Sequence, residues 1–542
     1  MISLRPSGWA IKLPPLKERT LAAVLERGIL LHPDKMAVRD PDRVLTYAQL
    51  YEQSLKMASG FDQLQVGRQE TVAIMLDNHI DIVLVWFALA LTARIEVPVN
   101  TSFRGRLLAH VIANCEARVL VIEKHYVDRL TTIMDLMPRL ETVVIRGNVV
   151  GVELPPRLKV EMLSSLTGKR VAAPQVDPWD LIGIMYTSGT TGVSKGVRAP
   201  HALAYQCATP QTWLCPGPDD INMITLPLFH IGAQWMGIFG TLIGGGGIVI
   251  QPRFSASNFW KDARDYQCTF AHVLGSMADF LYRQAPSQDD TRHPIRNMAM
   301  APVLPEVEAF KVRFGLDGVC TGYGMTEAGS VTGTPLGSSV VPGQIGWVRP
   351  DVEVRIVDKH DIDVPPGATG ELVIRHQDPW SVMDGYHQMP DATLSLWRNL
   401  WLHTGDMVRQ ADNGQLIFRD RIKDSIRRRG ENVSSFEVER EINEHPAVME
   451  SGIVAVPSSE SEDEVKACVV RRPGMALNAE ELLRFLIPRL PYFMVPRYIE
   501  FLDELPKTPT GKVRKHELRA VGVSSATWDR EVAGIVVSRS GR

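Results

Sequence analysis

Residues 186–197, which read Tyr-Thr-Ser-Gly-Thr-Thr-Gly-Val-Ser-Lys-Gly-Val, have the composition of a phosphate-binding loop. Glycines let backbone N–H groups turn toward an anion, hydroxyl side chains add neutral donors, and Lys195 supplies positive charge. A flexible Gly/Ser/Thr linker is the alternative that composition alone favours. The apolar run at residues 181–185 immediately before the loop is typical of a buried strand, and it therefore favours the phosphate-binding interpretation.

The loop does not match the Walker A pattern, in which a second glycine stands five residues after the first and precedes lysine and serine or threonine. The residue five places after Gly189 is Ser194, and the residue five places after Gly192 is Val197. The rest of the chain must therefore indicate which class of phosphate-binding protein this is.

Five further motifs follow this loop along the chain. They are Pro-Leu-Phe-His at 227–230, Tyr-Gly-Met-Thr-Glu at 323–327, His-Thr-Gly-Asp at 403–406, the charged stretch 420–432 and Pro-Lys-Thr-Pro-Thr-Gly-Lys at 506–512. Together with the loop, they resemble the adenylate-forming superfamily of acyl-CoA synthetases, adenylation domains of peptide synthetases and beetle luciferases. The resemblance extends from about residue 20 to 520, and six motifs in the correct order are far more specific than any one of them.

The resemblance implies two half-reactions in one cleft between a large N-terminal domain and a small mobile C-terminal domain. A carboxylate attacks the α-phosphate of ATP and gives an acyl-adenylate and pyrophosphate. A thiol, that of CoA, then attacks the acyl carbon, and AMP leaves. The implied substrates are therefore ATP, CoA and a small-molecule carboxylic acid, and the implied cofactor is Mg²⁺.

The resemblance also assigns the binding of the β- and γ-phosphates. A mobile glycine-rich clamp suits these groups because they depart as pyrophosphate. The residues concerned are Thr187, Ser188, Gly189, Thr190, Thr191, Gly192 and Lys195. Glu327 is expected to be the hard oxygen ligand of magnesium beside the phosphates, and a solvated loop glutamate is the alternative.

The adenosine part of ATP is assigned to four residues by the same resemblance. Tyr323 is expected to stack on adenine, which is compatible with its also being a core aromatic residue, and Thr326 belongs to the same nucleotide site. Asp406 is expected to accept hydrogen bonds from the ribose hydroxyls, because an ionised carboxylate only accepts. A turn aspartate after glycine is the alternative. Arg421 is expected to reach the same ribose.

Catalysis is assigned to Lys512, His230 and Glu327. Lys512 ends an extended Pro/Gly-rich loop and is expected to neutralise the charge shared by the attacking carboxylate and the α-phosphate. His230 is expected to line the acyl pocket near the reacting carboxylate, with a satisfied core histidine as the alternative. Lys423 matches the hinge position of the family, where the backbone absorbs the domain rotation. The acyl pocket is assigned by family position to Ala233, Gln234 and Gly237.

The chain departs from the family pattern after the hinge. Relatives often carry Gly-Gly before Glu-Asn, whereas this chain has Arg429-Gly430 preceded by Arg427 and Arg428. Two interpretations of the arginine run remain open. It is either a solvated face that nearby glutamates neutralise, or a CoA-binding site in which Arg428, Arg429 and Gly430 meet the phosphates of CoA.

Composition bounds the function classes. A chain of 542 residues is too long for one core, so at least two domains are expected, and a net charge of −3 gives no global attraction to nucleic acid. The six cysteines lie far apart without a Cys-x-x-Cys pair, which is typical of buried thiols in a cytoplasmic protein. The longest apolar run, 82–91, is too short to span a bilayer and is interpreted as a core helix rather than a transmembrane segment. The oligomeric state stays open, a homo-oligomer included.

The elements that must position these residues alternate between helical and strand-like runs from about residue 20 to 420. Short β-rich runs at 71–75, 119–122, 142–145 and 248–250 predict an α/β architecture. Between 350 and 375, alternating apolar and charged residues predict half-solvated strands in a smaller β-rich lobe.

A boundary is predicted near residue 420, where charge is concentrated. Ser434 followed by Glu437 is a capping box that predicts the start of a helix, and strand-like runs at 453–456 and 467–470 precede a helix at 479–487. The predicted domains are thus an N-terminal domain at 1–420, a small mobile α+β domain at 421–520 and a tail at 521–542.

The sequence therefore predicts an ATP-dependent acyl-CoA synthetase, a ligase that forms a carbon–sulfur bond, acting on a small or medium carboxylic acid. Segments 254–260, 427–439 and 456–467 resemble the carnitine/crotonobetaine-CoA ligase-type branch of the superfamily, which does not identify the acid. Two alternatives remain. One is an adenylating enzyme that loads a separate carrier protein, and the other is an inactive nucleotide-binding regulator.

Overall fold

The computed structural model describes residues 9, 13–187, 194–209, 216–335, 337–422, 426–428, 431–457, 463–508 and 511–537. Two seven-stranded sheets form the framework of its N-terminal part. The first sheet has the order β14-β13-β12-β10-β11-β1-β2 and is parallel except for β2. Its strands are Met36–Arg39 (β1), Val44–Thr46 (β2), Ile221–Ile224 (β10), Gly247–Ile250 (β11), Phe270–Leu274 (β12), Asn297–Ala301 (β13) and Gly318–Cys320 (β14).

The second sheet has the order β7-β6-β5-β3-β4-β8-β9 and is parallel except for β9. Its strands are Thr71–Met75 (β3), Ile95–Pro98 (β4), Val119–Glu123 (β5), Thr142–Arg146 (β6), Lys159–Met162 (β7), Leu181–Thr187 (β8) and Lys195–Pro200 (β9). The four β-rich runs predicted from the sequence correspond to β3, β5, β6 and β11.

Helices cover both faces of each sheet, as parallel sheets require. They are Leu21–Leu31 (α1), Tyr47–Gln63 (α2), Ile80–Ala90 (α3), Gly105–Asn114 (α4), His201–Ala208 (α5), Gly232–Phe239 (η6, a π-helix), Gly240–Gly244 (α6), Phe259–Asp265 (α7), Gly275–Tyr282 (α8) and Val307–Phe314 (α9). α4 packs on the outer face of the second sheet, and α7, α8 and α9 pack on the outer face of the first.

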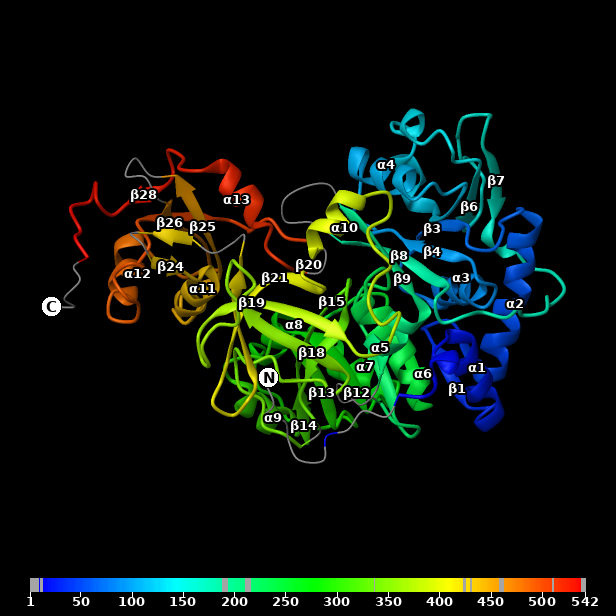
Figure 1. Ribbon diagram of the computed structural model, residues 1–542, viewed down its shortest axis with the longest axis horizontal. Coiled ribbons are helices and arrows are strands. Elements are labelled where there is room, and N and C mark those ends of the chain that lie inside the picture. Colours follow the sequence, from blue (N-terminus) through cyan, green and yellow to red (C-terminus); the bar gives the residue numbers. More distant parts are fainter. Residues whose placement is uncertain are drawn as a thin grey trace.

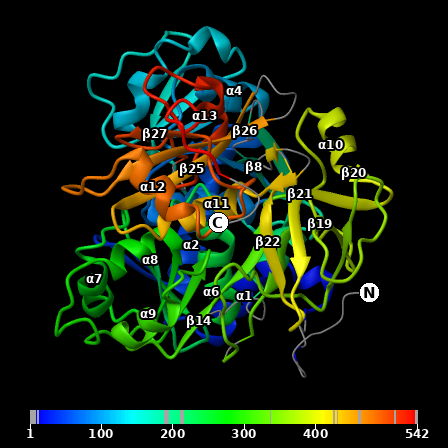
Figure 2. The same ribbon diagram turned by 90° about the vertical axis from the view of Figure 1, so that its left-hand side faces the viewer.

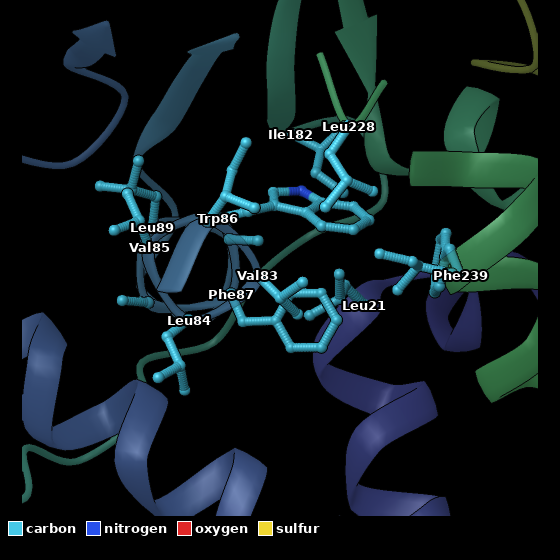
Figure 3. Packing of buried hydrophobic residues seen from close by; sticks show 14 of the residues in the cluster. Leu21, Val83, Leu84, Val85, Trp86, Phe87, Leu89, Ile182, Leu228 and Phe239 are labelled. Atoms are coloured by element: carbon cyan, nitrogen blue, oxygen red, sulfur yellow. The ribbon is translucent and has the colours of Figure 1, made fainter. Parts of the chain in front are cut away.

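The core between the sheets contains α3, α5 and η6. One cluster of buried side chains joins these helices to strands of both sheets, and Figure 3 shows Trp86 and Phe87 of α3 packed among Ile182, Leu228 and Phe239. A helix that is apolar on all faces has to be buried on all faces. The run at 82–91 is accordingly a core helix, as predicted. Within the described ranges, no helix combines the length and the apolar character needed to cross a membrane.

A β-rich lobe follows, as the alternating pattern at 350–375 predicts. A small sheet contains Gly322–Met325 (β15), Gly329–Gly333 (β16) and Trp347–Val348 (β17). A five-stranded sheet contains Val352–Val357 (β18), Gly370–His376 (β19), Trp397–Arg398 (β20), Trp401–Gln410 (β21) and Leu416–Arg421 (β22), and the short helix Pro390–Leu396 (α10) precedes β20.

The C-terminal unit, residues 426–537, lies at one end of the molecule beside this lobe (Figures 1 and 2). Its elements are Ile426–Arg428 (β23), Glu431–Val433 (β24), Ser435–Asn443 (α11), Val448–Pro457 (β25), Asp463–Arg471 (β26), Ala479–Leu486 (α12), Tyr498–Leu502 (β27), Lys515–Val521 (α13) and Trp528–Asp529 (β28). Ser434 caps α11 by accepting the Glu437 N–H, which is one half of the predicted capping box, whereas the Glu437 side chain pairs with Arg419. The mixed α/β fold with a large N-terminal and a smaller C-terminal part confirms the predicted fold class.

The segment expected to be a tail is attached to the C-terminal sheet over part of its length. The tail predicted at 521–542 contains β28, which pairs antiparallel with β27 and so belongs to the C-terminal sheet. Thr527 and Ser524 donate hydrogen bonds to the Glu500 carboxylate on β27, which holds this segment in place. No periodic pattern of apolar residues marks this strand in the sequence, because a strand of two residues is too short to show one.

Candidate active site

The nucleotide end of the candidate site lies where the small sheet β15–β17 meets the five-stranded sheet. β15 carries Tyr323, while Asp406 on β21 lies directly opposite Arg421 on β22 in the antiparallel register. The Tyr323 hydroxyl donates a hydrogen bond to Asp406 Oδ2 at 2.5 Å, and Arg421 Nε lies 3.5 Å from Asp406 Oδ1. The structure thus brings together three residues that the sequence analysis assigned to adenosine.

The two partners of Asp406 stabilise its charge. Burial raises the pKa of Asp406, while Arg421, the hydrogen bond from Tyr323 and the Lys512 charge lower it. Burial also raises the pKa of Tyr323, and the neighbouring Asp406 raises it further, so the phenol keeps its proton and remains a donor. Asp406 is therefore a buried acceptor with a donor or cation at each oxygen.

Glu327 lies in the turn between β15 and β16, where the charge of Lys195 acts on it. The Tyr386 hydroxyl donates to Glu327 Oε1 at 2.8 Å, and Lys195 Nζ lies 4.8 Å from the centroid of the Tyr386 ring. Burial raises the pKa of Glu327, while the Tyr386 hydrogen bond, Arg421 and Lys195 lower it. Thr326, half-buried, precedes Glu327 in the same turn.

Tyr386 is a residue of the site that sequence reasoning missed. Its loop is fastened to β9, because the N–H of Arg198 donates to Gly385 O at 3.0 Å and the N–H of His387 donates to Gly196 O at 2.7 Å. Gly385 has φ 114°, a conformation that favours glycine. The sequence offers only this Gly-Tyr pair in a polar loop as a pattern. Such a pair is weak evidence for a site residue unless its partner, here Glu327, is known.

The two ends of the phosphate-binding loop lie side by side. Thr187 at the end of β8 pairs with Lys195 at the start of β9 in the antiparallel ladder, and the Ser194 carbonyl accepts from His110 Nε2 at 3.0 Å. The other predicted phosphate ligands, Ser188, Gly189, Thr190, Thr191 and Gly192, lie outside the described residues. The strand predicted at 181–185 therefore leads directly into the loop.

His230 stands just before η6 and is held in one tautomer. Its Nδ1 accepts the Gly232 N–H at 3.0 Å, so a neutral ring carries its proton on Nε2. Burial lowers the pKa of His230 to about 4, and Lys512 and His272 lower it as well. His230 is thus a neutral hydrogen-bond donor near Lys512 of the C-terminal unit.

Asn78, also missed by the sequence analysis, fixes the turn that carries His230. Its Nδ2 donates to Leu226 O at 2.9 Å and to Gln251 O at 3.2 Å, and its Oδ1 accepts from Leu228 N at 2.9 Å. The Asn78 side chain, which follows β3 of the second sheet, therefore holds the segments that follow β10 and β11 of the first sheet.

The predicted acyl-pocket residues are buried in η6. Gln234 Nε2 donates to Glu96 Oε2 on β4 at 3.1 Å, and burial raises the pKa of Glu96 well above its usual range. A Cβ on Gly237 would lie 2.8 Å from Ile224 Cδ1, so glycine permits close packing of η6 on β10. Ala233 is also buried. Lining of the pocket by these residues stays a prediction.

Lys512 reaches the N-terminal part from the C-terminal unit. Two hydrogen bonds join Lys512 to Thr508, because Thr508 N donates to Lys512 O at 2.7 Å and Lys512 N donates to Thr508 Oγ1 at 3.1 Å. Desolvation lowers the pKa of the Lys512 amine, and so does Arg421, whereas Asp406 and Glu327 raise it. Lys512 thus shares its electrostatic surroundings with the residues assigned to ribose and magnesium, while part of the residue stays exposed.

Arg428 corrects the interpretation of the arginine run as an exposed surface. Its side chain is 1 % exposed, its Nε lies 2.7 Å from Glu464 Oε2, and its Nη1 donates to Phe493 O and Val495 O. A guanidinium that is engaged in this way is neither a solvated face nor a ligand for CoA phosphates in this conformation. Arg429, Gly430, Lys423 and the Arg427 side chain lie outside the described residues.

Comparisons with known proteins agree with this geometry. The family model "AMP-binding enzyme" matches residues 25–387, and the model "AMP-binding enzyme C-terminal domain" matches residues 437–512. Crotonobetaine/carnitine–CoA ligase of Salmonella paratyphi A is 30% identical over 486 residues, which cover 88% of this chain and 93% of that protein.

Solved structures share the fold. The anthranilate CoA ligase AuaEII in complex with anthranoyl-AMP has a TM-score of 0.84 at 23% identity, over 96% of this chain and 99% of that chain. ATP-bound MatB from Rhodopseudomonas palustris has a TM-score of 0.81 at 24% identity, over 92% of this chain and 98% of that chain. At these identities the likeness concerns the fold alone.

Proposed function

Because the chain belongs to the family of AMP-binding enzymes, we propose that it is an ATP-dependent acyl-CoA synthetase that forms an acyl-adenylate and then a thioester. One observation carries the proposal. Lys512 comes from the C-terminal unit, yet a Cβ on its neighbour Gly511 would lie 3.6 Å from Ser276 Oγ on α8 of the N-terminal part. The charged groups that shift the pKa of Lys512, namely Arg421, Asp406 and Glu327, all belong to the N-terminal part as well. A cation that is delivered to a nucleotide site across two units fits a reaction that joins two anions.

In this proposal, ATP binds with its ribose at Asp406. The carboxylate accepts from the ribose hydroxyls, and Arg421 lowers the pKa of Asp406 against the effect of its burial. The Tyr323 hydroxyl is already engaged with Asp406, which leaves the ring face for stacking on adenine. Thr326 belongs to the same nucleotide site.

The pyrophosphate portion binds at Lys195, Thr187 and the loop residues 188–192. Glu327 suits Mg²⁺, because it is a buried carboxylate that Tyr386 orients beside Lys195. An ion held there by Glu327 would supply positive charge to the phosphate oxygens. It also offsets the burial that raises the pKa of Glu327.

The first half-reaction needs the carboxylate of the acid next to the α-phosphate. His230 presents an Nε2–H donor on the neutral ring, which suits it to orient that carboxylate within the acyl pocket at Ala233, Gln234 and Gly237. Lys512 supplies the charge that offsets the repulsion between the two anions. The bond from the carboxylate oxygen to the α-phosphorus forms as the bond to pyrophosphate breaks.

The second half-reaction uses the thiol of CoA, for which the C-terminal unit turns about Lys423 and withdraws Lys512. We propose CoA rather than a carrier protein as the acceptor, since the relative named above is a CoA ligase. Arg429 and Gly430 remain the proposed contacts to CoA, without Arg428. We expect the enzyme in the cytoplasm, because the five described cysteines are buried free thiols.

A panel of acids tests the function and the substrate together. Pyrophosphate and AMP release would be measured with Mg²⁺ and ATP, with and without CoA, on carnitine, crotonobetaine, malonate, benzoate, anthranilate and straight-chain acids of two to ten carbons. We expect pyrophosphate with at least one acid and stoichiometric AMP only when CoA is added. Pyrophosphate release that CoA does not affect favours the carrier-loading alternative. No turnover with any acid, together with tight ATP binding, favours the inactive regulator.

A further inference from the structure

A chain of buried hydrogen bonds crosses from the N-terminal part to the C-terminal unit. Asp420 at the end of β22 accepts from the Ser435 backbone N–H at 2.6 Å and from Ser435 Oγ at 2.7 Å, both at its Oδ2. Both side chains are buried. Next to them, Ser434 Oγ donates to Arg419 O at 2.6 Å, and Arg419 forms an ion pair with Glu437.

The chain continues to the helix that follows the catalytic loop. Lys515 Nζ donates to Ser435 Oγ at 2.5 Å and lies 2.8 Å from Glu439 Oε1. Glu439 Oε1 in turn accepts from the Ile453 N–H at 2.7 Å, which fixes it to β25. Lys515 is the first residue of α13, three residues after Lys512. The position of Lys512 is thus tied through Ser435 to the end of β22.

The same strand end carries the nucleotide site. The Arg421 N–H donates to Asp420 Oδ1 at 2.8 Å, and Arg421 lies opposite Asp406 in the sheet. Asp420 Oδ1 therefore accepts a hydrogen bond within its own strand, next to Arg421 and Asp406. Asp420 Oδ2 accepts the hydrogen bonds that hold the C-terminal unit.

We infer that Asp420, Ser435 and Lys515 form a latch that holds Lys512 in the adenylation position and opens before the thioester step. The inference rests on the proposed function. Asp420 precedes Lys423 and Ser435 follows it, so a rotation of the C-terminal unit about Lys423 separates the two residues. A contact that exists in just one of two conformations stabilises that conformation, and it shifts the equilibrium toward it by the free energy of the contact. The three are positioning residues, since they act through Lys512.

The test uses Ser435→Ala and Asp420→Asn, with Ser451→Ala as the matched control. Ser451 is a buried serine of the same unit, and its Oγ donates to Asn443 Oδ1 at 2.9 Å within that unit. Adenylation would be followed as pyrophosphate release with Mg²⁺, ATP and crotonobetaine, or with whichever panel acid the wild type activates best. Thioester formation would be followed in single turnover from the corresponding synthetic acyl-adenylate and CoA.

We expect Ser435→Ala and Asp420→Asn to slow adenylation about tenfold and to leave thioester formation unchanged or faster. Ser451→Ala should leave both half-reactions within about twofold of the wild type. Equal losses in both half-reactions, or no change in either, would overturn the latch and leave a static contact.

A second readout is independent of activity. Limited trypsin digestion without substrates should cut the chain between β22 and β23 several-fold faster in Asp420→Asn than in Ser451→Ala, because loss of the latch lets the two units separate. Equal cleavage rates would also overturn the inference. If the wild type activates no acid, the proposed function fails while this digestion still decides whether the latch exists.

Discussion

Tyr323 and Asp406 stand 83 residues apart in the chain, yet the Tyr323 hydroxyl donates a hydrogen bond of 2.5 Å to the Asp406 carboxylate. The bond joins two motifs that each looked unremarkable, an aromatic residue in a strand and an aspartate after glycine. Its consequence is a buried acceptor with a hydrogen-bond donor at one oxygen, while Arg421 on the neighbouring strand lies near the other oxygen and lowers the pKa that burial raises. The predictions below start from this arrangement.

Asp406→Asn should raise the KM for ATP by about ten- to a hundredfold and leave the fold intact. The amide has nearly the same shape, but it loses the charge-assisted bonds to the ribose and to Arg421. Steady-state kinetics at limiting ATP would measure the effect. Asp363→Asn is the control, because Asp363 pairs with Arg355 at an exposed position. Near-normal turnover of Asp406→Asn would remove this residue from the ATP site.

Lys512→Ala should slow acyl-adenylate formation by about a hundredfold or more and largely preserve thioester formation from supplied acyl-adenylate and CoA. The first step joins two anions, whereas the second starts from an acid that is already activated. Arginine at this position should rescue only in part, since its head group is wider. Lys507→Ala is the control from the same loop, where Lys507 pairs with Glu450 at 2.5 Å. Equal loss in both steps would refute the alternating-domain proposal.

Tyr386→Phe should reduce kcat/KM for magnesium–ATP by about tenfold, because Glu327 loses the hydrogen bond that orients it. The matched control is Tyr126→Phe, which removes a 2.6 Å hydrogen bond to Asp77 away from the site. The two variants would be compared in initial-rate assays at several magnesium concentrations. Indistinguishable kinetics would mean that Tyr386 only packs in its loop.

His230 should make the protein less stable as the pH falls below about 6.5. The pKa of His230 is about 4 in the folded chain and about 6.5 when unfolded, so only the unfolded state binds this proton between those values. We expect a contribution of about 1–2 kcal/mol between pH 7.5 and 5. Urea titrations of the wild type and His230→Gln would measure it, and the variant should lose less stability on acidification. An identical pH dependence would contradict the prediction.

Arg428→Ala should destabilise the C-terminal unit rather than weaken CoA binding. The change leaves Glu464 buried without its cation, which typically costs about 3–5 kcal/mol. Arg484→Ala is the control, because the exposed Arg484–Glu480 pair should be worth about 0.5 kcal/mol or less. Thermal unfolding and the KM for CoA would be measured on both. A normal melting temperature with a raised KM would restore Arg428 to the CoA site.

The sequence by itself determined the fold class, the central helix and several of the strands. Local sequence patterns sufficed for these elements, because an apolar run bounded by polar residues, or a cap within one turn, is visible in the sequence alone. They include β3, β5, β6, β11 and α3. The order of the six motifs likewise sufficed to predict the family, since each motif is a short stretch whose residue types the chemistry requires.

The tertiary structure decided which side chains meet. Tyr386 reaches Glu327, and Asn78 holds the turn before His230, because the sheet order and the loop ties to β9 bring distant segments together. Arg428 is buried although its neighbours in the sequence are charged, since β23 packs against β26 and places it beside Glu464. Such contacts depend on strand order and register, which no local pattern of residues encodes.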